Sequence, residues 1–136
     1  MAFNLDTSAL VKLVVAEAET GALMAWLTER DRGPVSSDLA RTEPVRAVRR
    51  AAPDRILRAR TVLDAVVLLK VTTATFETAD RLEPAGLRSR DAIHVAAALD
   101  LGDDLEGFVA YDHRLASAAE ANGIAVSAPG GMPAGS

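Results

Sequence analysis

A short apolar run that ends in an aspartate and leads directly into a helical pattern occurs twice in this chain. In the first unit Asp6 follows residues 2–5, and in the second Asp112 follows residues 107–111. Parallel strands joined by crossovers bring their carboxyl ends to one edge of a sheet, and ligands bind there in open α/β sheets. The two aspartates therefore face one site if their strands are neighbours.

The rest of the chain alternates in the same way between strand and helix signals. Strands are predicted at residues 2–6, 34–36, 66–72, 107–111 and 124–126. Helices are predicted at residues 7–15, 20–31, 37–51, 53–65, 73–82, 91–101 and 113–122. This alternation predicts a doubly wound α/β domain with a parallel sheet. The longest apolar run, residues 66–69, is expected to be a buried strand.

The length of 136 residues fits one domain, which we place at residues 1–127. Residues 128–136 are rich in glycine and proline and offer nothing to bury, so we expect a disordered tail. The absence of cysteine excludes a disulfide framework and a thiolate metal site, and it fits the reducing cytoplasm. No secretory signal and no membrane-spanning apolar stretch is visible, so we expect a cytoplasmic protein that makes no membrane contact.

The net charge of −4 argues against a protein that coats nucleic acid through a general basic field. It does not exclude a nuclease, in which acids hold a metal and a local basic ridge contacts phosphates. The chain has such a basic ridge between residues 41 and 60. Its members are Arg41, Arg46, Arg49, Arg50, Arg55, Arg58 and Arg60. The alternative is an ordinary solvated helix face.

Four carboxylates are the candidate catalytic and metal-binding residues: Asp6, Glu43, Asp91 and Asp112. A cluster of acids is costly without a cation, which indicates a divalent metal. Each aspartate also stands at the start of a predicted helix, so a purely structural role as an N-cap, worth about 1 kcal/mol, is the alternative for all three.

Glu43 needs a different explanation, because it lies inside the predicted helix 37–51 and beside its apolar stripe. An acid that faces inward needs a partner, either a metal or a nearby arginine. Pro44 follows it and is expected to kink this helix. Four further residues are candidates for supporting roles: Thr7, Ser8, Arg88 and His94. Capping explains Thr7 and Ser8 equally well, and His94 either orients a carboxylate or is an ordinary half-buried histidine.

Several other chemistries are excluded by missing motifs. The chain has no glycine-rich phosphate loop and no nucleophile elbow around a serine. The Asp6-Thr7-Ser8 segment also lacks the second aspartate that an aspartyl phosphatase needs two residues further on.

Four segments together resemble the PIN-domain ribonucleases, and specifically the VapC toxins of bacterial toxin–antitoxin pairs. These segments are residues 5–12, 36–43, 87–98 and 108–115, and the order and spacing agree from residue 3 to about 126. The resemblance implies a three-layer α/β/α PIN-like domain with a central, mostly parallel sheet of four to five strands. Two positions depart from the family pattern: Ala110 replaces a frequent threonine, and Pro44 replaces an ordinary helix former. Since all four acids are present, we expect an active enzyme.

The resemblance also implies a function. The four acids would bind Mg²⁺ or Mn²⁺, and a metal-activated water would hydrolyse RNA phosphodiesters, which leaves 5′-phosphate and 3′-hydroxyl ends. Such an endoribonuclease toxin would have a cognate VapB-like antitoxin and would form a homodimer. Two alternatives stay open: a non-catalytic module that binds RNA or protein, and a metal-dependent phosphatase or DNA nuclease that uses the same acids.

Overall fold

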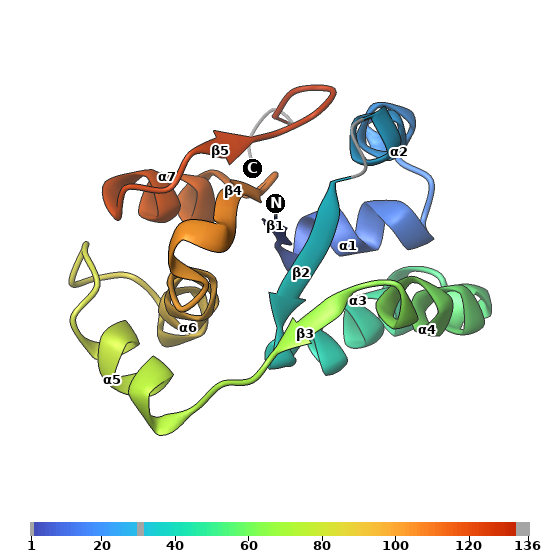
Figure 1. Cartoon of the computed structure of the whole chain (residues 1–136). Coiled ribbons are helices and arrows are strands. Elements are labelled where there is room, and N and C mark those ends of the chain that lie inside the picture. The colour runs from blue at the N-terminus through green and yellow to red at the C-terminus, as the bar shows by residue number, and fades with distance from the viewer. Residues whose placement is uncertain (1, 30–31, 133–136) are drawn as a thin grey trace.

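A five-stranded, entirely parallel sheet forms the centre of the protein, and helices cover both of its faces (Figure 1). The computed structural model describes residues 2–29 and 32–132. The strands are β1 (Ala2–Leu5), β2 (Gly33–Ser37), β3 (Val67–Leu69), β4 (Leu105–Val109) and β5 (Val126–Ser127). Their order is β3-β2-β1-β4-β5, so that β1 is central and has β2 and β4 as neighbours. The two strand-aspartate units are therefore neighbours, which meets the condition under which Asp6 and Asp112 face one site.

Seven α-helices and three short 3-10 segments connect the strands in the part of the chain that the structure describes. The helices are α1 (Thr7–Val14), α2 (Thr20–Glu29), α3 (Glu43–Ala51), α4 (Ile56–Asp64), α5 (Thr73–Asp80), α6 (Ser89–Leu99) and α7 (His113–Ala121). The 3-10 segments are η1 (Asp38–Arg41), η2 (Pro53–Arg55) and η3 (Gly102–Asp104). Helices α1 to α4 lie on one side of the sheet and α5 to α7 on the other (Figure 1), which confirms the predicted α/β/α layers.

Two apolar cores follow from the alternation of side chains along the strands. Phe3, Leu5 and Val109 pack in the core under α1 to α4, whereas Phe108 belongs to the core under α6 and α7. Helix α6 buries small side chains, since residues 96–98 are all fully buried alanines and Ala98 belongs to the second core. Small residues allow the helix to approach the sheet closely, and α6 contacts β2 and β4.

The region around Glu43 differs from the prediction of one continuous helix over residues 37–51. The chain first forms η1, turns at Thr42 and only then begins α3 at Glu43. Pro44 lies in the first turn of α3, where its missing N–H removes no helical hydrogen bond. The kink predicted at Pro44 is therefore wrong, and Glu43 stands at a helix start instead of inside one.

Two further expectations differ from the structure. The run 66–69 is not a buried strand as a whole, because β3 is an edge strand and Val67 is 62% exposed. The segment expected to be a disordered tail packs in its described part: Ala128 and Met132 contact the two cores, and the carbonyl of Pro129 accepts a hydrogen bond from the Tyr111 hydroxyl at 2.6 Å. The rest of that expectation, residues 133–136, lies outside the described residues.

The helices of the described chain are all too short or too polar to cross a lipid bilayer.

Candidate active site

An open pocket of about 500 Å³ lies at the carboxyl ends of the central strands, and all four predicted acids line it. Asp6 directly follows β1 and Asp112 closely follows β4. Glu43 begins α3, and Asp91 lies in the first turn of α6. Four different elements therefore deliver one carboxylate each to the same place.

Asp6 is the most buried of these acids, with 1% of its surface exposed. Its Oδ1 accepts a hydrogen bond from the amide of Ala9 at 2.8 Å, so it caps α1 as predicted. The Ser8 hydroxyl lies 2.6 Å and 2.8 Å from its two oxygens. Burial raises the pKa of Asp6 to about 6, against the lowering effect of these hydrogen bonds and of His94, and the nearby charge of Asp112 raises it further. The protein's own side chains therefore do not offset the burial of the Asp6 charge.

The other two aspartates differ in their capping roles. Asp112 is exposed and caps α7, because its Oδ1 accepts from the amides of Arg114 and Leu115 at 2.9 Å and 3.4 Å. The predicted cap at Asp91 is wrong: α6 begins two residues earlier, and Arg88 holds the cap position. Asp91 instead faces the pocket with 8% exposure. Burial raises its pKa against the opposing charge of Arg90, and the charge of Asp112 adds to the increase.

Glu43 is held by three donors from two helices, Thr7 on α1 and both Arg90 and His94 on α6. Its Oε1 accepts from the Thr7 hydroxyl at 2.9 Å and lies 2.6 Å from His94 Nε2, while its Oε2 is 3.5 Å from Arg90 Nε. Burial alone would raise the pKa of Glu43, but the hydrogen bond and charge of His94, followed by Thr7 and Arg90, lower it below the ordinary value. The arginine pairing weighed for Glu43 is therefore present, together with the contact to His94.

His94 is buried, with 2% exposure, and both of its ring nitrogens have polar neighbours. Nδ1 lies 3.0 Å from the Ser37 hydroxyl, whose oxygen already accepts from the amide of Leu39. The hydroxyl proton of Ser37 can therefore go to Nδ1, which leaves the Nε2–H to donate to Glu43. This geometry agrees with the prediction that His94 orients a carboxylate, and not with an ordinary half-buried histidine.

The remaining predicted supporting residues divide into two groups. Thr7 and Ser8 both line the acid pocket and bind its carboxylates, Thr7 to Glu43 and Ser8 to Asp6. Arg88 does not line that pocket but lies in a neighbouring one that it shares with Asp91.

Lys12 is a pocket residue that the sequence analysis did not identify. It is 5% exposed and lies on α1 one turn beyond Ser8, and its Nζ is 2.8 Å from Glu19 and 3.5 Å from Glu17. The ammonium also stands 4.7 Å from the centre of the Tyr111 ring. The available signal was a lone lysine inside the apolar stretch of residues 9–15, which predicts a buried pair when its face is buried.

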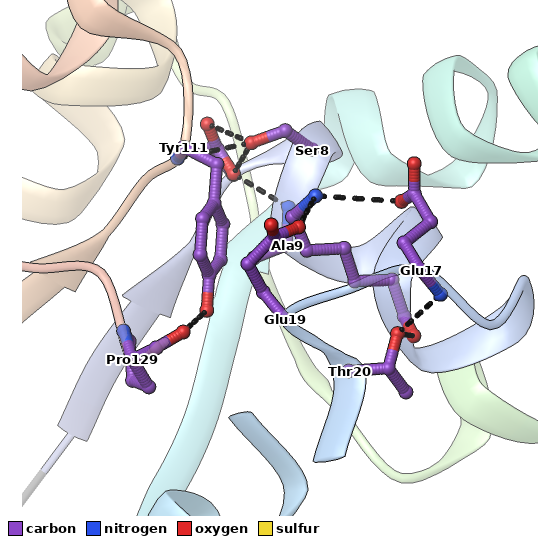
Figure 2. Close-up of polar contacts among 9 residues, drawn as sticks. Ser8, Ala9, Glu17, Glu19, Thr20, Tyr111 and Pro129 are labelled. Carbon is purple, nitrogen blue, oxygen red and sulfur yellow. Dashed lines mark hydrogen bonds and ion pairs between the residues drawn. The ribbon is translucent and has the colours of Figure 1, made fainter. Parts of the chain in front are cut away.

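Tyr111 lies between Ser8 and Pro129 and has a hydrogen bond to each of them (Figure 2). Its backbone amide donates to the Ser8 hydroxyl at 3.1 Å, and its own hydroxyl donates to the Pro129 carbonyl at 2.6 Å. Burial raises the pKa of Tyr111 to about 12, and the charges of Glu19 and Asp6 contribute. The tyrosine therefore stays protonated and keeps its hydrogen bond to the C-terminal segment.

The donor chemistry of the pocket fits a divalent metal, because carboxylate oxygens are the ligands that Mg²⁺ and Mn²⁺ prefer. Burial raises the pKa of Asp6 to about 6 despite its hydrogen bonds, which is the setting in which a bound cation would favour the ionised carboxylate. Among the described residues, however, no three acidic or histidine side chains are gathered closely enough to hold an ion. The oxygens of Asp6 and Glu43 instead face Ser8, Thr7 and His94, so metal binding would require the carboxylates to turn toward one another.

Comparison with known proteins agrees with this architecture. The family model of the PIN domain matches residues 4–121. Ribonuclease VapC46 of Mycobacterium tuberculosis (strain ATCC 25618 / H37Rv) is 43% identical over 129 residues, which cover 94% of this chain and 98% of the relative. Ribonuclease VapC47 of M. tuberculosis (strain CDC 1551 / Oshkosh) is 41% identical over 132 residues, with 94% and 97% covered.

A solved structure supports the fold independently of sequence. The crystal structure of VapBC2 from Rickettsia felis, bound to a DNA fragment from its promoter, contains a chain that matches with a TM-score of 0.68 at 12% identity, and the match covers 95% of this chain and 99% of that one. The family match, the relatives and the four acids at one sheet edge lead to the same conclusion: this chain belongs to the PIN-domain family, among the VapC ribonucleases.

Proposed function

We propose that this chain is the toxin of a VapBC-type toxin–antitoxin pair and acts as an endoribonuclease that depends on Mg²⁺ or Mn²⁺. The observation that carries the proposal is the convergence of four carboxylates from four elements in one pocket, where Asp6 is buried and its pKa is raised by that burial. The relatives at 41% and 43% identity are named ribonucleases, which supports RNA as the substrate.

Asp6, Glu43, Asp91 and Asp112 are the residues that would hold the metal. When bound, a divalent cation would neutralise charge at the phosphate and lower the pKa of a bound water. The protein's own part is to aim the carboxylates: Ser8 and the amide of Ala9 hold Asp6.

Glu43 is aimed by a separate set of contacts. Thr7 and His94 both contact its Oε1. Its Oε2, which lies near Arg90, is therefore the oxygen that would turn toward a metal. Because both ring nitrogens of His94 are engaged and the ring is buried, His94 is not placed as a general base. Attack by water therefore explains the site better than attack by the ribose 2′-hydroxyl, which needs an accessible base.

A free ribonuclease is harmful to its own cell, so the proposal includes a VapB-like antitoxin that covers the pocket. A cationic side chain of such a partner would neutralise the acids. The VapBC2 complex of R. felis supports this partner class by its fold alone. We further propose a homodimer, which light scattering of the full chain would detect.

The proposal is tested by calorimetric titration of Mn²⁺ into the antitoxin-free full chain and into Asp6→Asn and Asp112→Asn. Asparagine caps a helix about as well as aspartate but removes the charge. Asp54→Asn is the matched control, since Asp54 is exposed and lies outside the pocket. We expect binding that is lost in the first two variants, is kept in the control, and is accompanied by RNA cleavage in the wild type.

A wild type that binds no Mn²⁺, even with RNA present, would contradict the proposal. The caps at Asp6 and Asp112 would then be purely structural, and a non-catalytic binding module would be the better interpretation. Metal binding with cleavage of DNA or phosphate monoesters in place of RNA would favour the alternative metal-dependent enzymes.

A further inference from the structure

We propose that Arg46 and Arg50 form a subsite for an RNA backbone phosphate next to the acid pocket. The inference rests on the proposed function and deepens it, because it says where the substrate chain lies beside the acids. It also replaces the broad basic ridge predicted from the sequence by two particular side chains.

Arg46 and Arg50 lie one helical turn apart on α3 and therefore project from the same face of the helix. Both line the pocket that contains Asp6, Glu43, Asp91 and Asp112. Together with Arg49 they also line a second hollow of about 240 Å³. The two hollows share these arginines, so a cationic wall continues outward from the acid cluster.

Among the described residues, the three guanidinium groups on α3 have no carboxylate partner. Across residues 2–29 and 32–132, no acidic side chain comes within ion-pair distance of Arg46, Arg49 or Arg50. The arginines near them are paired, Arg41 with Asp38 at 2.9 Å and Arg90 with Glu43 at 3.5 Å. Like charges three and four residues apart destabilise a helix, so this face of α3 is arranged to receive an anion.

The helix dipole explains only part of this arrangement. Arg49 and Arg50 lie in the last turn of α3, where cations are favoured, but Arg46 lies near its beginning, where they are not. The position of Arg46 therefore calls for another cause, and its place on the pocket wall supplies one.

The acid cluster and the neighbouring arginines together indicate the ligand. The acids would hold a metal at the phosphate that is cut, while the arginines stand where a neighbouring phosphate of the same strand would lie. The planar fork of arginine suits bidentate contact with phosphate oxygens. Contacts to backbone phosphates position a strand without reading its sequence, so the subsite fits any single-stranded RNA.

The other arginines of the predicted ridge lie elsewhere. Arg55 belongs to η2 and Arg58 and Arg60 to α4, and none of them lines either hollow. Arg58 Nε contacts the Leu13 carbonyl at 3.4 Å. Arg55 and Arg60 are exposed, which makes them a charge-matched control.

The test measures the affinity of a fluorescent single-stranded RNA for the full chain in EDTA, which prevents cleavage, over a range of NaCl concentrations. The variants are the double substitution Arg46→Gln/Arg50→Gln, the control Arg55→Gln/Arg60→Gln, and the charge-preserving Arg46→Lys/Arg50→Lys. Each lost contact to a single strand reduces the salt slope by about 0.7. We expect the first variant to lower the slope by about 1.4 and to weaken binding roughly tenfold.

The control should keep both the slope and the affinity, and the lysine variant should keep most of the slope. If Arg46→Gln/Arg50→Gln and the control behave alike while the wild type still cleaves RNA with Mn²⁺, the subsite is refuted and the proposed function stands. The subsite is also refuted, and the proposed function stands, if Arg46→Gln/Arg50→Gln weakens the binding of the antitoxin but not the binding of RNA. A wild type that neither binds nor cleaves RNA would instead refute the proposed function. All of the substituted arginines are exposed, and a thermal melt establishes that each variant is folded.

Discussion

Replacement of Asp6 by asparagine should make the metal-free protein more stable at neutral pH. Asp6 is buried, and its pKa is raised from 3.8 to about 6. Its folded form therefore holds a proton more tightly than its unfolded form does. The tighter binding of this proton stabilises the folded state fully below about pH 4, and the stabilisation is lost as the pH rises through 6.

The magnitude follows from the pKa. At about 1.36 kcal/mol for each pKa unit, ionised Asp6 lowers the free energy of unfolding at pH 7 by about 3 kcal/mol relative to a neutral residue. Asparagine preserves the local contacts: its Oδ1 accepts from Ala9, and its Nδ2 can donate to the Ser8 oxygen, which is 2.8 Å from the present Oδ2. For a domain of this size the gain corresponds to roughly 10 °C in Tm.

Urea unfolding in EDTA between pH 4 and pH 8 measures the effect. We expect the free energy of unfolding of Asp6→Asn to exceed that of the wild type by about 3 kcal/mol at pH 7 and by only a few tenths of a kcal/mol at pH 4. Saturating Mn²⁺ should stabilise the wild type and leave the variant unchanged. An Asp6→Asn protein that is less stable than the wild type at pH 7 would refute the reasoning, because the carboxylate would then be compensated in the metal-free site. Asp54→Asn controls for the general effect of charge removal.

Four further predictions concern the surroundings of the acids. The apparent Mn²⁺ affinity should rise about tenfold for each pH unit up to about pH 6, since binding must displace the proton of Asp6, and a flat calorimetric profile from pH 5 to 6 would contradict this. His94→Ala should weaken Mn²⁺ binding about 10- to 100-fold by releasing Glu43, whereas His94→Gln should keep part of the affinity; equal affinities in all three proteins would show that Glu43 needs no positioning. Tyr111→Phe should lower the free energy of unfolding by about 1 kcal/mol through loss of the bond to Pro129, without a change in Mn²⁺ affinity, and an unchanged urea midpoint would disprove the role of that bond. Lys12→Met should lower Tm by roughly 5 °C, because Glu19 loses its buried cation, and Lys12→Met/Glu19→Gln should recover part of the loss; no recovery would mean that packing, not charge, is the cause.

The fold could be predicted from the sequence because its strand and helix signals are local and regular. The two strand-aspartate units placed Asp6 and Asp112 at the same sheet edge, whereas the pairing of β1 with β4, which brings them side by side, is seen only in the structure. Glu43 and Asp91 were candidates from their places on predicted helices, and the family resemblance agreed with them, but their distance from Asp6 and Asp112 depends on how α3 and α6 pack.

The errors have specific physical causes. The helix predicted around Glu43 was too long: Ser37 ends β2, η1 takes residues 38–41, and α3 begins only at Glu43. A proline directly after the glutamate is itself a signal of a helix start. Asp91 is no cap because α6 begins at Ser89, two residues before the predicted start. This shift of about half a turn places the carboxylate in the pocket. Helix boundaries of this kind depend on tertiary packing.

Contacts between distant segments could not be predicted at all. The hydrogen bond of Tyr111 to Pro129 orders a glycine-rich segment that has no secondary-structure signal. The pairing of Lys12 with Glu19 depends on how α2 folds back beside α1. Likewise, nothing in the sequence separates Arg46 and Arg50 from the other arginines between residues 41 and 60, because that division depends on which hollow each one lines.

The chemical nature of the cleaved ends tests the central claim most directly. RNA digested by the full chain in Mg²⁺ or Mn²⁺ should carry 5′-phosphate and 3′-hydroxyl ends, and no cleavage should occur in EDTA or with Asp6→Asn. Ends that carry a 2′,3′-cyclic phosphate, or cleavage that persists in EDTA, would contradict hydrolysis by a metal-activated water at the four carboxylates.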